Sequence, residues 1–133
     1  MARKITLKGI KKKADLVFSQ YIRRLRSDSS GRTMCVTCGD IKLWKEHQNG
    51  HYFPRNRLAT RFHEDNCHPQ CPRCNIWEKG NYTAYAAYMY KKYGTVKMEQ
   101  LEQLSRKLIK FTIQDYQEMI EGWQIMMEKM DGK

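Results

Sequence analysis

Two short stretches of this sequence decide how the chain folds: Cys35-Val36-Thr37-Cys38-Gly39 and Cys71-Pro72-Arg73-Cys74. Each contains a Cys-x-x-Cys pair, a spacing that lets both sulfur atoms reach one zinc ion at about 2.3 Å. Two such pairs make a closed shell of four thiolates with no position left for a reactant. The pattern therefore predicts a structural zinc ion, and the alternatives are a redox-active dithiol or buried free thiols.

The segment between the two cysteine pairs holds all four histidines of the chain, His47, His51, His63 and His68. Taken singly, His47 and His63 are expected to be surface or hydrogen-bonded histidines. His51 is different, because it shares a zinc-stapled frame with two amide side chains, Asn66 and Asn75. A fifth cysteine, Cys67, fits neither pair, and we expect it to pack in the core.

The charge of the chain indicates an anionic partner. The sequence has 25 Lys and Arg against 14 Asp and Glu, a net charge of +11, with the excess in the N-terminal and middle parts. Nucleic acid is favoured, although ribosomal partners or acidic lipids would attract such a surface too. The sequence has no run of about 18 apolar residues and no secretory signal pattern, so we expect a soluble, cytoplasmic protein, in which cysteine pairs favour metal over disulfides.

The pattern of apolar residues predicts a single α+β domain in three parts. Residues 1–13 are expected to form a basic flexible arm. Residues 14–95 are expected to form the zinc-stapled core, with a helix over 14–27, a short hairpin within 35–74 and a helix over 75–93 that ends at Gly94. Residues 96–133 are expected to form a helical extension.

The helical extension is predicted to contain two helices, because apolar residues recur at steps of three and four over 98–111 and again over 113–130. Thr112 and Asp115 have the spacing of a capping box that opens the last helix. The apolar stripe of that helix either packs on the core or forms the seam of a homodimer.

At these positions the chain resembles the HNH, or ββα-metal, nucleases that carry a four-cysteine zinc site in a treble-clef-like core. Over about residues 14–110 it resembles the lambdoid phage NinG/Rap recombination protein family. The motifs that carry the resemblance are Cys35-x-x-Cys38-Gly39, Gly50-His51-Tyr52, Arg61-Phe62, Asn66-x-His68-x-Gln70-Cys71, Cys74-Asn75 and Gly80-Asn81. The family implies a phage or prophage protein in a bacterial host that cleaves branched or recombining DNA, such as Holliday junctions or D-loops.

The resemblance also implies roles for individual residues. His51 is the candidate general base that takes a proton from the attacking water, a task that suits an imidazole near neutral pH. Asn75 matches a family ligand of a catalytic Mg²⁺ or Mn²⁺ ion, which would neutralise the phosphate. Asn66 matches the family's central asparagine, whose amide braces the loop that orients His51.

One position departs from the family pattern. Many members have Asp or His directly before the catalytic histidine as a metal ligand, whereas this chain has Gly50. His68 is the expected replacement, since residues two apart on a strand share a face and His68 would lie beside Asn66. The substitutes are Asp65, Glu64 and Asn49. If none of them reaches the ion, the site would bind DNA without cutting it.

Further basic and aromatic residues surround these motifs. The simplest interpretation of the basic residues is a solvated surface. Beside a phosphodiester site, however, they are candidate phosphate contacts. These are Arg55, Arg57, Arg61, Arg73 and Lys79. A row of tyrosines at 82, 85, 88, 90 and 93 is expected to be core, with stacking on unpaired bases as the alternative.

The resemblance therefore implies a metal-dependent DNA endonuclease. Two rivals stay open. One is a non-catalytic, zinc-containing nucleic-acid-binding module, which needs the cysteines and basic residues but not His51, Asn66 or Asn75. The other is a recombination adaptor that holds a recombinase or polymerase partner through the methionine-rich C-terminal stripe.

Overall fold

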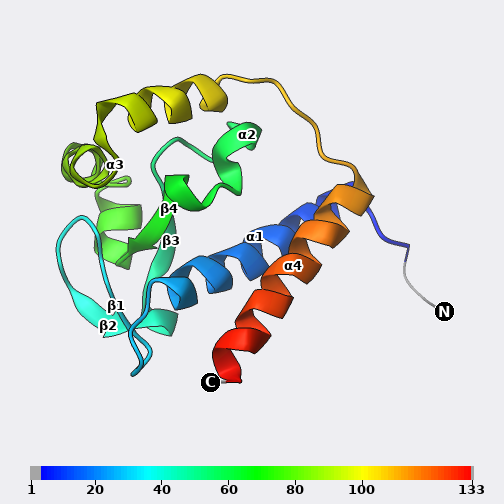
Figure 1. The fold of residues 1–133 in the computed structure, drawn as a ribbon, viewed down its shortest axis with the longest axis horizontal. Helices are drawn as coiled ribbons and strands as arrows, with labels where there is room; N and C mark the ends of the chain where they lie inside the picture. The colour runs from blue at the N-terminus through cyan, green and yellow to red at the C-terminus, as the bar shows by residue number, and fades with distance from the viewer. Residues whose placement is uncertain (1–3, 133) are drawn as a thin grey trace.

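The computed structural model describes residues 4–132, which form a mixed α+β fold. Along the chain, the short strands and the cysteines come between helix α1 (Leu7–Leu25) and helix α3 (Tyr82–Ser105), and helix α4 (Ile113–Asp131) lies against α1 (Figure 1). Within residues 4–132, no helix is long and apolar enough to cross a membrane.

Helix α1 begins at Leu7 rather than at the predicted Ala14. The hydroxyl of Thr6 caps it by accepting a hydrogen bond from the backbone N–H of Gly9 at 3.0 Å. Ile10 extends the buried stripe of this helix by one turn toward its start. The prediction of a flexible arm is therefore wrong for residues 7–13, which are helical, while its residues 1–3 lie outside the described part of the chain.

The four strands form two antiparallel pairs instead of the single predicted hairpin. Strand β1 (Arg32–Met34) pairs with β2 (Ile41–Leu43), and the first cysteine pair lies in the connection between them. Strand β3 (Gln48–His51) pairs with β4 (Cys67–Gln70). The long connection between β3 and β4 contains the short helix α2 (Leu58–Arg61).

Three single turns of helix complete this region: η1 (Trp44–Glu46), η2 (Glu64–Asn66) and the π-helical turn η3 (Arg73–Trp77). The helix predicted from Asn75 is therefore interrupted, and α3 starts only at Tyr82. Between them the chain reverses through Lys79, Gly80 and Asn81, all with positive φ angles. The predicted break at Gly94 is confirmed, because Gly94 has φ 80° and ψ 165° and separates two helical halves of α3.

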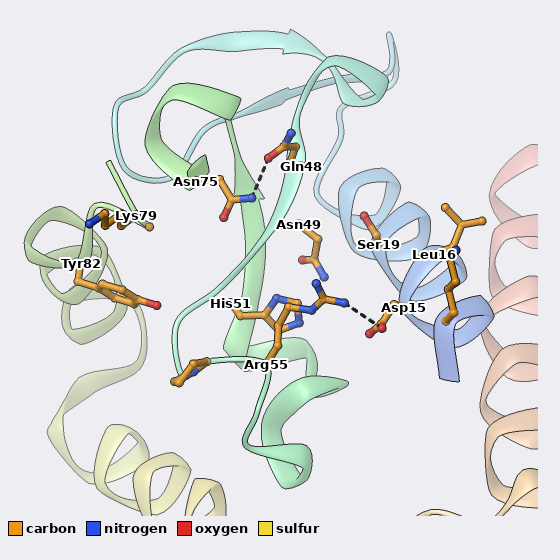
Figure 2. A pocket seen from close by; sticks show the side chains of 13 residues that line it. Asp15, Leu16, Ser19, Gln48, Asn49, His51, Arg55, Asn75, Lys79 and Tyr82 are labelled. Atoms are coloured by element: carbon orange, nitrogen blue, oxygen red, sulfur yellow. Dashed lines mark hydrogen bonds and ion pairs between the residues drawn. The ribbon is translucent and has the colours of Figure 1, made fainter. Parts of the chain in front are cut away.

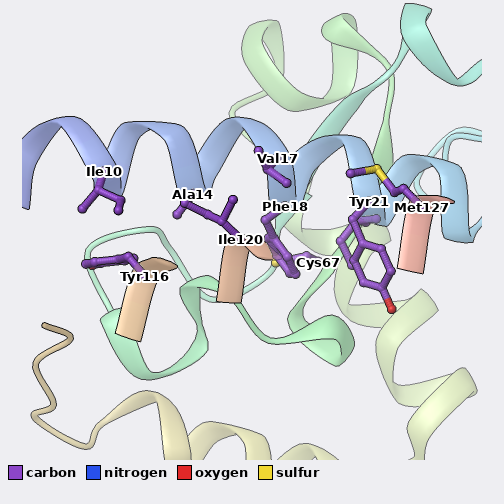
Figure 3. Close-up of a cluster of buried hydrophobic side chains, with 10 residues drawn as sticks. Ile10, Ala14, Val17, Phe18, Tyr21, Cys67, Tyr116, Ile120 and Met127 are labelled. Atoms are coloured by element: carbon purple, nitrogen blue, oxygen red, sulfur yellow. The ribbon is translucent and has the colours of Figure 1, made fainter. Parts of the chain in front are cut away.

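Two apolar clusters hold the fold together. The larger one joins α1 to α4: Tyr116, Ile120 and Met127 are spread along the buried face of α1, and Cys67 of β4 lies beside Phe18 (Figure 3). The prediction that Cys67 packs in the core is confirmed, and the apolar stripe of α4 packs within its own chain. The N-terminus of α4 has the predicted capping box of Thr112 and Asp115. The second cluster lies under α3, around Tyr85, Met89, Met98 and Leu101.

Candidate functional site

The four cysteines of the two Cys-x-x-Cys pairs converge on one point. The sulfur atoms of Cys35, Cys38, Cys71 and Cys74 all lie within 4.8 Å of one another, and only Cys38 is exposed. Burial alone would raise the pKa of the Cys35 thiol, but hydrogen bonds from the Thr37 hydroxyl and from backbone N–H groups lower it to about 6. Four converging thiols with a ready thiolate could hold a zinc ion, as the sequence predicts.

A pocket of about 600 Å³ opens between α1, β3 and the turn after η3. Its side chains come from four separate parts of the chain, and His51 lies near its centre (Figure 2). The lining residues that matter here are Lys12, Asp15, Gln48, Asn49, His51, Arg55, Asn75 and Lys79. Three of the eight carry a positive charge, so the pocket suits an anionic ligand.

The imidazole of His51 is fixed in one tautomer. Its Nε2 atom lies 2.9 Å from the backbone carbonyl oxygen of Arg61. A carbonyl oxygen only accepts, so Nε2 carries the proton and Nδ1 is left with a lone pair. Burial lowers the pKa of His51 to about 4, against the opposing effect of the Arg61 hydrogen bond, and the positive charge of Arg55 lowers it further. At neutral pH His51 is therefore uncharged and able to accept a proton.

Asp15 on α1 anchors the residue that holds His51. Its carboxylate accepts from Arg61 Nε at 2.8 Å and from Arg61 Nη2 at 2.5 Å, and Arg55 Nη2 donates to it at 2.9 Å. Burial raises the pKa of Asp15, but the two arginines outweigh it and keep the pKa below its usual value. Sequence reasoning missed Asp15. One feature of the sequence could have drawn attention to Asp15, because it is the only acidic residue among the first 27.

The two asparagines lie in different places. Asn66 is fully buried, and its amide accepts from the backbone N–H of Phe53 at 2.7 Å and donates to the carbonyl groups of Phe53 and Thr60 at 3.0 Å. It thus braces the loop that follows His51. Asn75 lines the pocket, where its Nδ2 donates to Gln48 Oε1 at 2.8 Å and leaves its own Oδ1 available (Figure 2).

His68 does not join the site, contrary to the sequence prediction. It lies opposite Gly50 in the β3–β4 pair, whereas His51 lies opposite Cys67, so the two histidines face opposite sides. His68 is fully buried, with Nδ1 3.0 Å from the Tyr85 hydroxyl and Nε2 2.8 Å from the Tyr93 hydroxyl. Both ring nitrogens are occupied, which removes His68 as a metal ligand.

Packing explains why the residue directly before His51 is a glycine. A Cβ atom on Gly50 would lie 2.0 Å from Gln70 Oε1. The Gln70 amide cannot easily move aside, because it is fully buried and its Nε2 donates to the carbonyl of Gly80 at 2.8 Å and to Thr37 Oγ1 at 3.1 Å. The buried amide of Gln70 thus occupies the space that a side-chain ligand at position 50 would need.

Of the three substitutes for this ligand, only Asn49 lines the pocket. Glu64 accepts a hydrogen bond from the Tyr21 hydroxyl, and Asp65 pairs with Lys97 at 3.1 Å. Asn49 has a buried Oδ1 atom with no hydrogen-bond partner among residues 4–132. A buried carbonyl oxygen without a partner is costly, and a cation or a water molecule would satisfy it.

The predicted phosphate contacts divide into two groups. Arg55 and Lys79 line the pocket, and Lys12 of α1, which sequence reasoning missed, joins them. The other three are engaged elsewhere. Arg61 is held by Asp15, Arg57 donates to Ser105 Oγ at 2.9 Å, and the exposed Arg73 lies 3.5 Å from Glu78. Arg57 and Arg61 therefore hold the fold together, in contrast to the prediction.

The two remaining histidines have the structural roles predicted for them. His47 is buried, with Nε2 3.0 Å from the carbonyl oxygen of Thr33, and His63 Nδ1 accepts from the backbone N–H of Asp65 at 3.1 Å.

The row of tyrosines predicted to be core is only partly buried: Tyr85 is in the core, while Tyr82 and Tyr90 are about half exposed.

Residues 2–132, nearly the whole chain, match the model of a protein family described as bacteriophage lambda NinG protein. No curated protein and no solved structure matches the chain.

Proposed function

Because this chain belongs to the bacteriophage lambda NinG family, we propose that it is a metal-dependent endonuclease that hydrolyses phosphodiester bonds in branched or recombining DNA. The observation that carries the proposal is the state of His51. It is an uncharged imidazole, held at Nε2 by the Arg61 carbonyl, in a pocket lined by Lys12, Arg55 and Lys79.

In this proposal His51 is the general base. A water molecule that attacks the phosphorus atom gives its proton to Nδ1 of His51, and the ring becomes an imidazolium. The hydrogen bond to the Arg61 carbonyl keeps the ring oriented, and the nearby Asp15 carboxylate favours the charged form. Lys12, Arg55 and Lys79 bind the phosphate oxygens and hold the scissile bond against the base.

In this proposal a divalent cation such as Mg²⁺ or Mn²⁺ binds to oxygen donors on the β3 side of the pocket. Asn75 Oδ1 and the orphaned Asn49 Oδ1 are the residues that would hold it, since hard cations prefer oxygen ligands and keep several waters. When bound, the cation supplies charge neutralisation at the phosphate and at the leaving oxygen. The four-cysteine zinc would take no part in this chemistry, and its task is to hold η3 and β4 in place.

A second candidate function is DNA binding without cleavage. The observation that favours it is Gly50, which leaves the site without the side-chain ligand that many relatives have at this position, while Gln70 fills the space. In that case the basic pocket would hold a phosphate group, and His51 would contribute only to its shape.

A cleavage assay with a matched histidine pair separates the two functions. The substrates are linear duplex, single-stranded and four-way-junction DNA, with Mg²⁺ or Mn²⁺ added or left out; a chelator is avoided because it would also remove zinc. His51→Ala should lose cleavage and keep DNA binding, whereas His63→Ala, on the same connection but outside the pocket, should cut like the wild type. Equal cutting by both variants would refute the general-base role of His51, and a wild-type protein that binds DNA without cutting it would refute the nuclease proposal.

A further inference from the structure

We propose that Trp77, with Ile76 beside it, is a stacking site for an unpaired base of the DNA substrate. The proposal rests on the proposed function for its partner, DNA, and adds the feature of the DNA that the protein recognises. It concerns residues that the catalytic pocket does not use, since neither Ile76 nor Trp77 lines it.

The exposure of these two side chains is the first observation. Trp77 is 80% exposed and Ile76 is 56% exposed. The other two tryptophans, Trp44 and Trp123, are partly covered, and Trp44 packs against the guanidinium group of Arg23. Among residues 4–132, no aromatic ring and no cationic group packs on the Trp77 ring. The fold therefore leaves a large flat apolar surface uncovered.

The position of Trp77 is the second observation. The same turn, η3, carries Asn75, whose side chain lines the pocket two residues before Trp77, and Lys79 lines the pocket two residues after it. Because side chains two apart on a helical turn point to different sides, the indole lies on the turn that borders the proposed phosphate site without entering the pocket. In the proposal, a DNA strand whose phosphate is bound at Asn75 and Lys79 passes this turn, and an unpaired base that flanks the phosphate stacks on the ring.

The rigidity of the turn is the third observation. Cys74, within η3, belongs to the zinc-binding cluster, and its carbonyl accepts from the backbone N–H of Gly80 at 2.8 Å. The carbonyl of Gly80 in turn accepts from the buried Gln70 amide. Both ends of the segment that carries Trp77 are therefore fixed, so little backbone conformational entropy would be lost when a base packs on the ring.

The chemistry selects an unpaired base over a duplex or a protein. Bases within a duplex already stack on each other, whereas a base at a gap or branch offers a free π face that an indole can cover. The charges around Trp77 suit a nucleic acid: Glu78 pairs with Arg73, and Lys79 remains as an exposed positive charge on a chain of net charge +11. Ile76 would add an apolar contact of the kind that wedges between bases.

The experiment compares binding to a fluorescein-labelled linear duplex with binding to the same duplex carrying a short unpaired gap. All proteins carry His51→Ala and no Mg²⁺ or Mn²⁺ is added, so that no probe is cut whether or not His51 is the general base. Trp77→Ala should weaken binding of the gapped probe about tenfold and change duplex binding by less than twofold, because one stacked base is lost. Trp77→Phe keeps a π face and should retain most of the affinity. Leu108→Ala, at an exposed apolar residue between α3 and α4, is the matched control and should change neither.

Three results would overturn the proposal: no loss with Trp77→Ala, an equal loss on both probes, or a change in the oligomeric state of the DNA-free protein, which would identify a protein interface instead. Trp77→Ala should leave the thermal unfolding curve unchanged, because the ring is exposed. The outcome is independent of the nuclease proposal. If His51→Ala cuts normally, the gap preference can still hold, and if the gap preference is missing, the nuclease can still be active.

Discussion

The two faces of the β3–β4 pair each carry one histidine, the half-buried His51 and the buried His68, and the two rings have different hydrogen-bond partners. His51 faces α1 and the pocket, with one ring nitrogen bound to a carbonyl and the other left with a lone pair. His68, on the opposite face, has both nitrogens engaged by tyrosine hydroxyls. Burial lowers the pKa of both, to about 4 for His51 and about 3 for His68, so both rings are uncharged at pH 7.

His51 and His68 differ in their hydrogen-bond partners rather than in the effect of burial on their pKa values. The Tyr85 hydroxyl donates to the carbonyl of Gly50 at 2.7 Å, so its oxygen must accept from His68 Nδ1–H, and His68 Nε2 then accepts from Tyr93. His68 is thus the opposite tautomer to His51 and has no lone pair to offer. A depressed pKa alone would not identify a general base, because both rings share it. The proposed role of His51 rests instead on its unoccupied nitrogen beside a basic pocket.

The largest expected effect comes from breaking the four-cysteine cluster, which lies next to β4 and therefore next to both histidines. Cys74→Ser should abolish zinc binding and unfold the region around β4 and η3, because the free energy of binding a structural zinc ion is part of the folding free energy. Zinc content by atomic absorption and thermal unfolding would measure it. Cys67→Ala, in the α1–α4 core, is the control and should keep its zinc with a loss of about 1 kcal/mol. A Cys74→Ser protein that melts like the wild type would contradict the structural role.

The second prediction compares alanine variants of His51 and His68. His51→Ala should reduce the cleavage rate by about 100- to 10,000-fold with little change in stability, because the general base is lost. His68→Ala should keep the cleavage rate per folded molecule but lower the free energy of unfolding by about 2 kcal/mol, because Tyr85 and Tyr93 lose buried partners. Single-turnover cleavage and urea unfolding would measure the two quantities. If His68→Ala lost cleavage while folded, the contrast between the faces would fail.

The third prediction concerns acid stability. Below pH 6.5 the unfolded chain binds protons at both histidines, whereas the folded chain does not until pH approaches 4 or 3. The free energy of unfolding should therefore fall as pH drops from 7 to 5, by about 2 kcal/mol for each histidine. Urea unfolding at both pH values would test this. His68→Gln should make the fall shallower, and an identical fall in the variant would show that His68 already titrates normally.

The smallest expected effect concerns Asp15, the residue that anchors the pocket face. Asp15→Asn weakens the hold on Arg61 and should lower the cleavage rate at saturating DNA about tenfold, because the carbonyl that orients His51 becomes less fixed. Nitrogen-15 NMR should show His51 leaving the single Nε2–H tautomer, a change that a merely structural role would not produce. The control is Asp40→Asn, at an exposed ion pair with Lys42. An unchanged tautomer in Asp15→Asn would contradict the anchoring role.

Features that depend on local sequence were predicted well. The cysteine pairs, the capping box at Thr112 and the helix break at Gly94 each follow from a few adjacent residues, and the structure has all three. The start of α1 was missed because Lys-rich residues 7–13 contain one buried apolar residue, Ile10, too few to show a helical period without the partner helix α4.

Features that depend on register or on distant partners were not predictable. The sequence prediction placed His68 and Asn66 on one face of a strand. In the structure Asn66 belongs to the η2 turn and strand β4 begins at Cys67, so the alternation of side chains between the two faces starts one residue later. Arg61 and Arg57 look like phosphate contacts in the sequence, yet their partners are Asp15 and Ser105, more than 40 residues away in each case.

The packing of α1 against α4 has a consequence for how the chain folds during synthesis. Ile10, Phe18 and the rest of the α1 stripe leave the ribosome first, but the surface that covers them, Tyr116 to Met127, is made last. At about 5–20 residues per second, the apolar face of α1 stays uncovered for several seconds, which favours chaperone capture or aggregation. The cysteine cluster can fill with zinc before α4 exists, so it is the natural nucleus for the nascent chain.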